Sequence, residues 1–139
     1  MTDFDPTTLE SYRFWAAEHV RFADLDMLGH VNNKAYATYY ETARVAYMSS
    51  RGLSDGLKVG MALVRLEVDY RKEIRFPATL RLGVRLLKLG NSSLKLACAI
   101  FDDGGCASTS VSTAVRFSPA TRGSQPFTPE ERALLEQDL

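Results

Sequence analysis

The sequence predicts an α+β domain in which one antiparallel sheet of five strands wraps around one long central helix. The first observation is the order of the patterns along the chain, which is one strand, one long helix and then four strands. The second is that each predicted strand has one apolar face and the helix has one apolar stripe. A single sheet wrapped around a single helix buries all of these surfaces at once.

The first strand and the helix occupy the first third of the chain. Residues 12–22 alternate between apolar and polar side chains, which predicts a strand. Apolar and aromatic side chains then recur at helical spacing, at Tyr36, Tyr39, Tyr40, Ala43 and Tyr47. Asn32 or Asn33 suits the N-cap position, whereas Arg51 and Gly52 provide a basic last turn and a terminating glycine. We therefore expect the helix to end at about residue 51, before a loop over residues 52–60.

The remaining strands follow in the second half of the chain. Residues 62–71 and 80–86 alternate strongly, and the turn at residues 102–105 joins the last two strands as a hairpin. Pairing Asp102 with Gly105 places Cys98 opposite Thr109 and Cys106 opposite Phe101. The two thiols then lie on opposite faces of the sheet and cannot form a disulfide. In this register one face carries Leu94, Leu96, Cys98, Ile100, Ala107, Thr109, Val111, Val115 and Phe117, and the other carries Lys95, Ala97, Ser108, Ser110, Ser112 and Arg116.

The chain of 139 residues has the length of a single domain, which we assign to residues 1–139. Residues 1–10 form a polar lead-in. Residues 128–139 contain a short helix, because Thr128, Pro129 and Glu131 combine an N-cap, a proline at the first helical position and a capping box.

Composition excludes several classes of function. The 17 basic and 17 acidic residues cancel, which gives no attraction to nucleic acid or to an anionic membrane. No apolar run is long enough to span a bilayer, and the N-terminus lacks the features of a signal peptide. Two cysteines suit a reducing compartment, so we expect a cytoplasmic protein. We expect neither a metal nor a cofactor, since the two histidines and two cysteines lack ligand spacing.

A polar segment stands directly before the helix. Residues 24–33 contain two aspartates, a glycine, a histidine and two asparagines, and they lead into a helix start where backbone N–H groups lack partners. The run DLDMLGHVNNKAYATYYETAR, residues 24–44, resembles the signature of hotdog-fold acyl-CoA thioesterases of the 4-hydroxybenzoyl-CoA thioesterase-like group. It is also similar to a run in plant acyl-ACP thioesterases, which carry an asparagine where this chain has Leu28. Residues 68–71 and 90–93 resemble the family more loosely.

The resemblance implies a hotdog fold and places the catalytic carboxylate at Asp26, with a family histidine at His30. The residues fit that chemistry, because thioester hydrolysis needs an activated water or a nucleophile together with donors for the developing oxyanion. Asp26 can act as general base or as nucleophile. The N–H of Asn33, joined by that of Asn32 or Lys34, can hold the oxyanion at the helix start.

Further residues complete the predicted site. Some hotdog thioesterases use a carboxylate on the helix, which makes Glu41 the reserve base, although an ion pair with Arg44 is the default expectation for Glu41. The phosphates of CoA require a basic dock. The predicted substrate contacts are Gly29, Asn32, Tyr36, Arg71, Lys72, Arg75, Lys88, Ser92 and Ser93.

Two other classes of function stay open from the sequence alone. The domain can be a non-catalytic module that binds acyl-CoA or acyl-ACP, since a helix N-terminus binds a carbonyl whether or not hydrolysis follows. A hotdog hydratase or dehydratase is the third alternative. The partners we expect are an acyl-CoA, or an acyl-ACP, and further copies of this chain. The resemblance implies a dimer or a dimer of dimers, because two sheets of this family join edge to edge.

Overall fold

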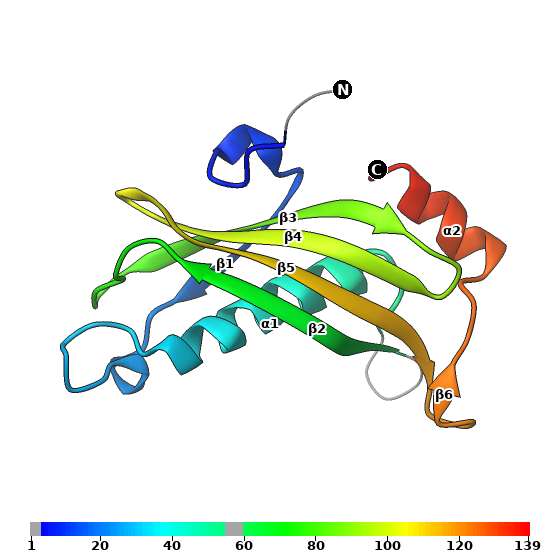
Figure 1. The fold of residues 1–139 in the computed structure, drawn as a ribbon, viewed down its shortest axis with the longest axis horizontal. Coiled ribbons are helices and arrows are strands. Elements are labelled where there is room, and N and C mark those ends of the chain that lie inside the picture. Colours follow the sequence, from blue (N-terminus) through cyan, green and yellow to red (C-terminus); the bar gives the residue numbers. More distant parts are fainter. Residues whose placement is uncertain (1–3, 55–59) are drawn as a thin grey trace.

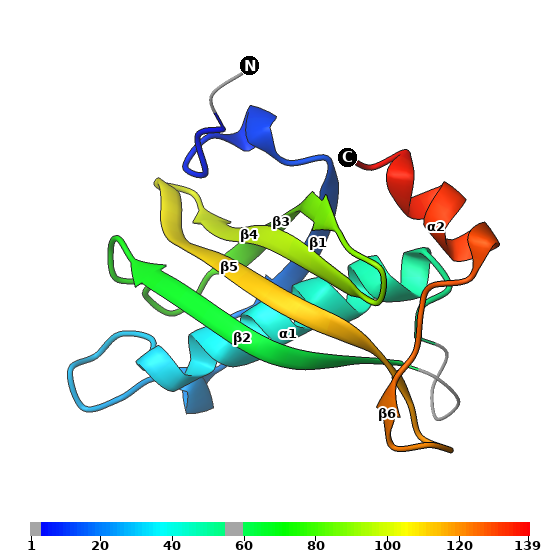
Figure 2. The ribbon, with the colours of Figure 1, turned by 45° about the vertical axis from the view of Figure 1, so that its right-hand side comes forward.

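The computed structural model describes residues 4–54 and 60–139, and it shows one curled antiparallel sheet wrapped around a long helix (Figures 1 and 2). The predicted sheet-on-helix architecture is confirmed. The elements are η1 (Leu9–Ser11), β1 (Phe14–His19), η2 (Phe22–Asp24), α1 (Asn33–Ser50), β2 (Gly60–Tyr70), β3 (Thr79–Leu89), β4 (Ser93–Asp102), β5 (Gly105–Ser118), β6 (Gly123–Ser124) and α2 (Pro129–Glu136). The strand order is β1-β3-β4-β5-β2, so β1 and β2 form the two edges; the two-residue β6, which the sequence did not predict, pairs with β5.

Helix α1 begins and ends where the sequence predicted. The side chain of Asn32 caps it by accepting the N–H of Lys34 at 2.9 Å. At the other end Arg51 is the C-cap residue, and Gly52 adopts a φ of 72°, a conformation that a residue with a Cβ rarely adopts. The tyrosine stripe packs into the concave face of the sheet, where Tyr39 and Tyr40 are fully buried.

The first predicted strand is shorter than expected. It covers Phe14–His19, because the residues on either side turn away from the ladder. Tyr12 packs on the convex face of the sheet, where a Cβ on Gly83 would approach its ring within 2.7 Å. Beyond β1, Arg21 and Asp24 close a short 3-10 turn that leads into the polar loop.

The predicted hairpin register is correct at the turn and wrong beyond it. Asp102 pairs with Gly105 and Phe101 pairs with Cys106, as predicted. A β-bulge next to Ile100 then shifts the register by one residue, so Cys98 lies opposite Ser110 instead of Thr109. A shift of one residue turns every following side chain to the other face. The helix-facing row of β5 therefore consists of Ser108, Ser110, Ser112, Ala114, Arg116 and Ser118.

A second bulge corrects the prediction for residues 62–71. The register of β2 with β5 shifts between Leu63 and Arg65, which leaves Val64 60% exposed. Ala62 and Leu66 therefore lie on opposite faces, although regular alternation over residues 62–71 would put two residues four positions apart on the same face. The two cysteines are both free, as expected from their positions on opposite faces of the sheet.

The C-terminal helix is confirmed. Thr128 and Glu131 form the capping box, and α2 packs beside the turn between β3 and β4, where Arg132 donates to the carbonyl of Gly90 at 2.5 Å. Part of the predicted loop over residues 52–60 lies outside the described residues. Within the described part of the chain, no helix has the length and apolarity needed to cross a membrane.

Candidate functional site

The polar segment before α1 folds into a tight loop closed at its base. Leu25 and Val31 form an isolated antiparallel bridge, and the N–H of Asp26 donates to the carbonyl of His30 at 3.1 Å. Gly29 makes the turn possible, since its φ of 83° belongs to the left-handed region. Asp26 and His30 thus lie opposite each other at the base of the loop, one step before the helix.

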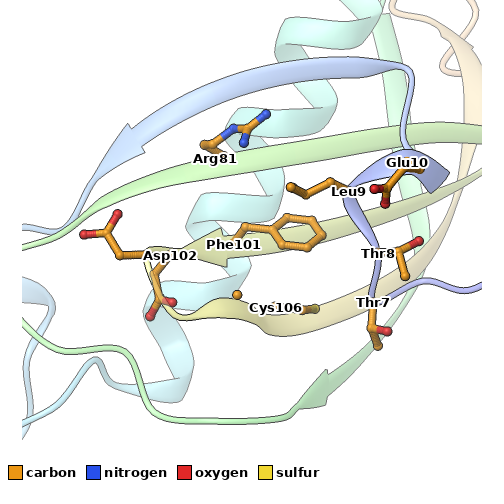
Figure 3. Close-up of a pocket in the computed structure, with 10 residues that line it drawn as sticks. Thr7, Thr8, Leu9, Glu10, Arg81, Phe101, Asp102 and Cys106 are labelled. Carbon is orange, nitrogen blue, oxygen red and sulfur yellow. The ribbon is translucent and has the colours of Figure 1, made fainter.

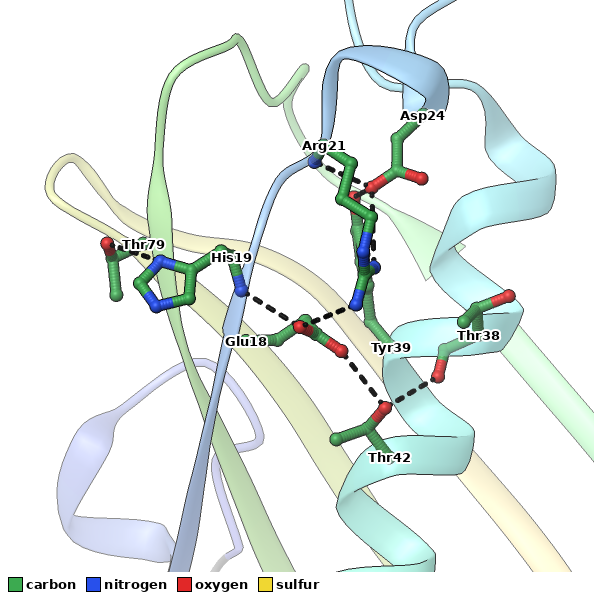
Figure 4. A network of polar contacts seen from close by, with 8 residues as sticks. All are labelled: Glu18, His19, Arg21, Asp24, Thr38, Tyr39, Thr42 and Thr79. Atoms are coloured by element: carbon green, nitrogen blue, oxygen red, sulfur yellow. Dashed lines mark hydrogen bonds and ion pairs between the residues drawn. The ribbon is translucent and has the colours of Figure 1, made fainter.

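A network of polar contacts anchors the start of this loop to α1 (Figure 4). Asp24 accepts the hydroxyl proton of Tyr39 at 2.6 Å and the N–H of Arg21 at 3.0 Å. One turn along, Glu18 accepts the hydroxyl of Thr42 at 3.1 Å. Asp24 therefore has a structural role, and it leaves Asp26 as the aspartate available for chemistry.

Asp26 is half-buried, and one of its carboxylate oxygens is held in place. Its Oδ1 accepts the N–H of Leu28 at 2.9 Å, which is the local turn contact typical of aspartate. Within the described residues, no further hydrogen bond to its side chain is found. The carboxylate is thus oriented through one oxygen, while the other can accept a proton.

A cleft of about 230 Å³ opens beside the loop, between the start of α1 and the end of β2. Its walls are His30, Val31, Asn33, Tyr36, Tyr70, Arg71, Lys72 and Glu73. Five of these residues belong to the predicted site: His30, Asn33, Tyr36, Arg71 and Lys72. The segments meet here because the N–H of Val31 donates to the carbonyl of Ile74 at 2.8 Å, which fixes the loop against the chain that follows β2.

His30 and Tyr36 present polar atoms near this cleft. The Nδ1 of His30 lies 3.1 Å from the carbonyl of Val31, and its Nε2 lies 3.9 Å from the Glu73 carboxylate. A proton on Nδ1 would leave Nε2 as the acceptor. Burial raises the pKa of Tyr36 to about 12, so its hydroxyl stays protonated at neutral pH. The ring of Tyr36 packs edge-on against Tyr70 with centroids 4.9 Å apart.

The N–H of Asn33 occupies the first helical position, where no acceptor exists within the helix. This is the position that the sequence analysis proposed for holding an oxyanion. Because Asn33 also lines the cleft, a carbonyl in the cleft has access to the helix start.

The basic residues near the cleft are partly neutralised by neighbours. Lys72 forms an ion pair with Asp102 at 2.6 Å, and Arg75 forms one with Glu73 at 2.5 Å. Both cations are at least one-third exposed, so these surface ion pairs are weak and can exchange for a phosphate.

The structure does not bring every predicted residue to this cleft. Asn32 lines a neighbouring cleft of about 280 Å³ with Asp24 and Lys34. Lys88, Ser92 and Ser93 lie at the turn between β3 and β4, at the opposite end of the sheet from the polar loop (Figure 1). Within one chain they form a separate group, and their substrate contact stays a prediction.

The ion pair expected between Glu41 and Arg44 is not found within the described part of one chain. Glu41 is exposed on α1, but Arg44 is only 6% exposed, and none of the ion pairs among the described residues joins the two. The two charges still attract each other at longer range, because Glu41 raises the pKa of Arg44 against the larger, lowering effect of burial.

A larger cavity, of about 510 Å³, lies on the convex face of the sheet (Figure 3). It is enclosed by the segment of residues 7–10 and by side chains of β3, β4 and β5, including Arg81, Phe101 and Cys106. The sheet separates this cavity from α1 and from the polar loop. We therefore take the smaller cleft as the candidate site, because His30 and the helix start at Asn33 line it. Asp26 lies on the same loop but is not among the residues that line the cleft.

The sequence analysis missed two residues of the cleft, Tyr70 and Glu73. Tyr70 falls in the alternating run of residues 62–71, which predicts a strand position and no role in a site, yet it is 50% exposed because β2 is an edge strand. Glu73 carried no signal in the sequence. In the described ranges, 4–54 and 60–139, no group of three or more histidine, cysteine or acidic side chains is arranged to hold a metal ion.

A sheet curled around one long helix, with a polar loop before the helix start, defines a thioesterase-type hotdog domain. The chain belongs to the thioesterase-like superfamily, whose family model matches residues 20–135. It is 32% identical over 87 residues to the uncharacterized protein YsmA of Bacillus subtilis (strain 168), a match that covers 62% of this chain and 59% of the length of that curated relative.

Solved structures agree with the family. The PA5185 protein of Pseudomonas aeruginosa strain PAO1 superposes with a TM-score of 0.84 at 28% identity, over 93% of each chain. A thioesterase of Thermus thermophilus, solved with coenzyme A and zinc, superposes with a TM-score of 0.76 at 28% identity, over 89% of this chain and 98% of that one.

Proposed function

We propose that this protein hydrolyses an acyl-CoA thioester to the free acid and CoA. The observation that carries the proposal is the position of Asp26, a carboxylate held through one oxygen on the turn before α1. Its backbone N–H donates to the carbonyl of His30, which lines the cleft together with Asn33. Membership of the thioesterase-like superfamily supports the reaction class.

The reaction follows from the geometry of the helix start. The thioester carbonyl lies at the N-terminus of α1, where the N–H of Asn33 donates to the oxygen as it becomes negative. Asp26 removes a proton from water, or attacks the carbonyl itself to give an anhydride that water then opens. His30 orients the water or the leaving thiolate.

The group that carries the acyl chain of the substrate is CoA. A related thioesterase has been solved with coenzyme A, which supports the same class of ligand here. Arg71 and Lys72 line the cleft and Arg75 follows them, so a basic surface begins where the pantetheine arm would leave the site. A remote anchor of this kind holds a flexible substrate with its thioester at Asp26.

The decisive experiment measures free thiol released from a panel of acyl-CoAs. We expect Asp26→Asn to fold normally and to lower turnover by about two orders of magnitude or more, the scale of general acid–base catalysis. Glu41→Gln is the matched control, since it removes a carboxylate from α1 and should retain most of the activity. Full activity in a folded Asp26→Asn protein would transfer the role to Glu41. Tight acyl-CoA binding without any turnover would favour a non-catalytic binding module.

We also propose that two copies pair through β2. This edge strand exposes apolar side chains, with Leu63 45%, Val64 60% and Tyr70 50% exposed. An uncovered, partly apolar edge is a place for strand pairing. Such a dimer would put the cleft at the subunit boundary, because Tyr70 belongs to both the edge and the cleft. Sedimentation velocity at micromolar concentration should give a dimer or larger, and an active monomer would disprove the pairing.

A further inference from the structure

A second groove lies beside the candidate cleft, on the convex face of the sheet. Its volume is about 320 Å³, and its walls come from the N-terminal segment, residues 4–12, and from strands β2 to β5. Figure 3 shows this segment in front of the sheet and α1 behind it, so the groove and the helix lie on opposite faces. Arg71 lines both the groove and the cleft. The two cavities therefore meet at this residue.

The end of β2 explains how one residue reaches both cavities. Successive residues of a strand point to opposite faces of the sheet. Tyr70 lines the cleft, whereas Asp69 pairs with Thr109 and lines the groove. The Nε of Arg71 donates to the hydroxyl of Thr109 at 3.2 Å, so the guanidinium lies over the convex face. Because β2 is an edge strand that ends at Tyr70, a flexible ligand in the cleft can pass around this end into the groove.

The charge of Arg71 is available to a ligand. Lys72 pairs with Asp102 and Arg75 pairs with Glu73, but none of the ion pairs among the described residues includes Arg71. The bond to Thr109 uses Nε, which leaves the two Nη groups for another acceptor. A guanidinium presents these groups as a planar fork that matches a phosphate. An anion at the junction of the two cavities would therefore meet a cation that has no competing carboxylate within the described chain.

The rest of the groove suits an adenine ring. Ala97, Val111 and Leu87 form an apolar floor, and Phe4, which is 37% exposed, forms one wall. Nucleobases stack on aromatic side chains, and a cavity of this size lies within the range of small-molecule sites. Asp69 is exposed on the rim, and its side chain makes no hydrogen bond or ion pair among the described residues. Its carboxylate can accept a proton from the amino group of adenine.

We infer that the groove on the convex face binds the nucleotide end of CoA, with the adenine beside Phe4 and a phosphate on Arg71. The inference rests on the proposed function and specifies where the substrate is anchored. Passing around the edge of a sheet covers about 10 Å, the spacing of stacked sheets, which the pantetheine arm spans. The thioester then lies at the start of α1 on one face, while the nucleotide lies on the other. An anchor so far from the chemistry holds a flexible substrate without blocking its acyl group.

The experiment measures binding, so it does not depend on turnover. Calorimetry compares non-hydrolysable thioether analogues of octanoyl-CoA and of octanoyl-pantetheine, which lacks the nucleotide. We expect Val111→Trp to fill the groove and to weaken binding of the CoA analogue about tenfold or more relative to the pantetheine analogue. Val115→Trp is the matched control, because Val115 lies on the same face of β5 but outside the groove, and it should keep the wild-type ratio.

Two further variants test the groove without adding bulk, in case the tryptophan disturbs the sheet. Arg71→Met should weaken binding of the CoA analogue about tenfold, as expected for the loss of a charged hydrogen bond, and Phe4→Ala about threefold. Arg81→Met is the control for the charge, since Arg81 lines the larger cavity on the same face, and it should leave the affinity unchanged.

Three outcomes separate this inference from the proposed function. A wild type that binds neither analogue would contradict the proposed function, whereas equal affinity for both analogues would overturn the inference alone. An effect of Arg71→Met without any effect of Val111→Trp and Phe4→Ala would also overturn it, because the phosphate would then lie at the cleft. Adenosine 3′,5′-bisphosphate should compete with the CoA analogue. Simultaneous binding of both would make the groove a separate nucleotide site and would likewise overturn the inference.

Discussion

The two ends of α1 differ in how they are held. At the C-terminal end, Asp138 accepts the hydroxyl of Tyr47 at 2.7 Å and two N–H groups of Arg51 at 2.6 and 3.0 Å. At the N-terminal end the loop is fixed at its base, but its tip is open, with Met27 and Leu28 exposed. The closed end keeps the helix in place, whereas the open end leaves a carboxylate and a helix start accessible. Functional groups are commonly found on such loops that a rigid element positions.

Among substitutions that affect the two ends of α1 differently, Asp138→Asn should have the largest effect. The substitution removes a charge-assisted pair that is mostly buried and leaves the Arg51 guanidinium without its counter-charge. We expect the free energy of unfolding to fall by about 1–2 kcal/mol, measured by urea denaturation. The value of kcat/KM for acyl-CoA should stay within about twofold, because the far end of the helix does not touch the cleft.

The same pair gives the stability a defined dependence on pH. Hydrogen bonds from Arg51 hold the pKa of Asp138 below its usual value of 3.8. A depressed pKa in the folded state means that the contribution is complete above the unfolded value and is lost as the pH falls through the folded one. The difference in unfolding between wild type and Asp138→Asn should therefore be constant near pH 7 and shrink below about pH 4. A difference that grows on acidification would contradict the role given to this carboxylate.

A smaller effect should distinguish the two groups of basic residues. Neutralising Lys72 and Arg75 at the open end, as Lys72→Gln and Arg75→Gln, should raise KM for acyl-CoA up to about tenfold. It should also make KM less sensitive to salt, because fewer charges attract the phosphates. Thioesters that lack the nucleotide should be unaffected by the pair of substitutions.

Lys88→Gln, measured separately, sharpens this comparison, since Lys88 lies at the far end of the sheet. A smaller change in KM than for the Lys72 and Arg75 pair would place the CoA dock at the cleft. An equal change would mean that both ends contribute to one dock across subunits. Equal effects on substrates with and without the nucleotide would show that neither group binds it, and an acyl carrier protein would become the favoured donor.

The elements that the sequence predicted well are those set by local rules. The cap at Asn32, the glycine after Arg51 and the capping box of Thr128 and Glu131 each depend on residues a few positions apart. The alternation of β3 is likewise local, and it is regular up to Leu86, so its four leucine and valine side chains are buried as expected. The position of Asp26 and His30 before the helix also follows from the sequence alone.

The tertiary structure determined which side chains of β5 face the core. Two bulges, beside Ile100 and beside Val64, each shift the strand pairing by one residue. The sequence cannot locate these bulges, because polar and apolar residues alternate in the same way on either side of each one. The first bulge places Ser108, Ser110 and Ser112 on the buried face of β5. The cleft depends on contacts between residues about forty positions apart, such as those of Tyr36 with Tyr70 and of Val31 with Ile74. The sequence by itself therefore determined the fold and which polar residues precede the helix start, and long-range packing decided which residues line the cleft.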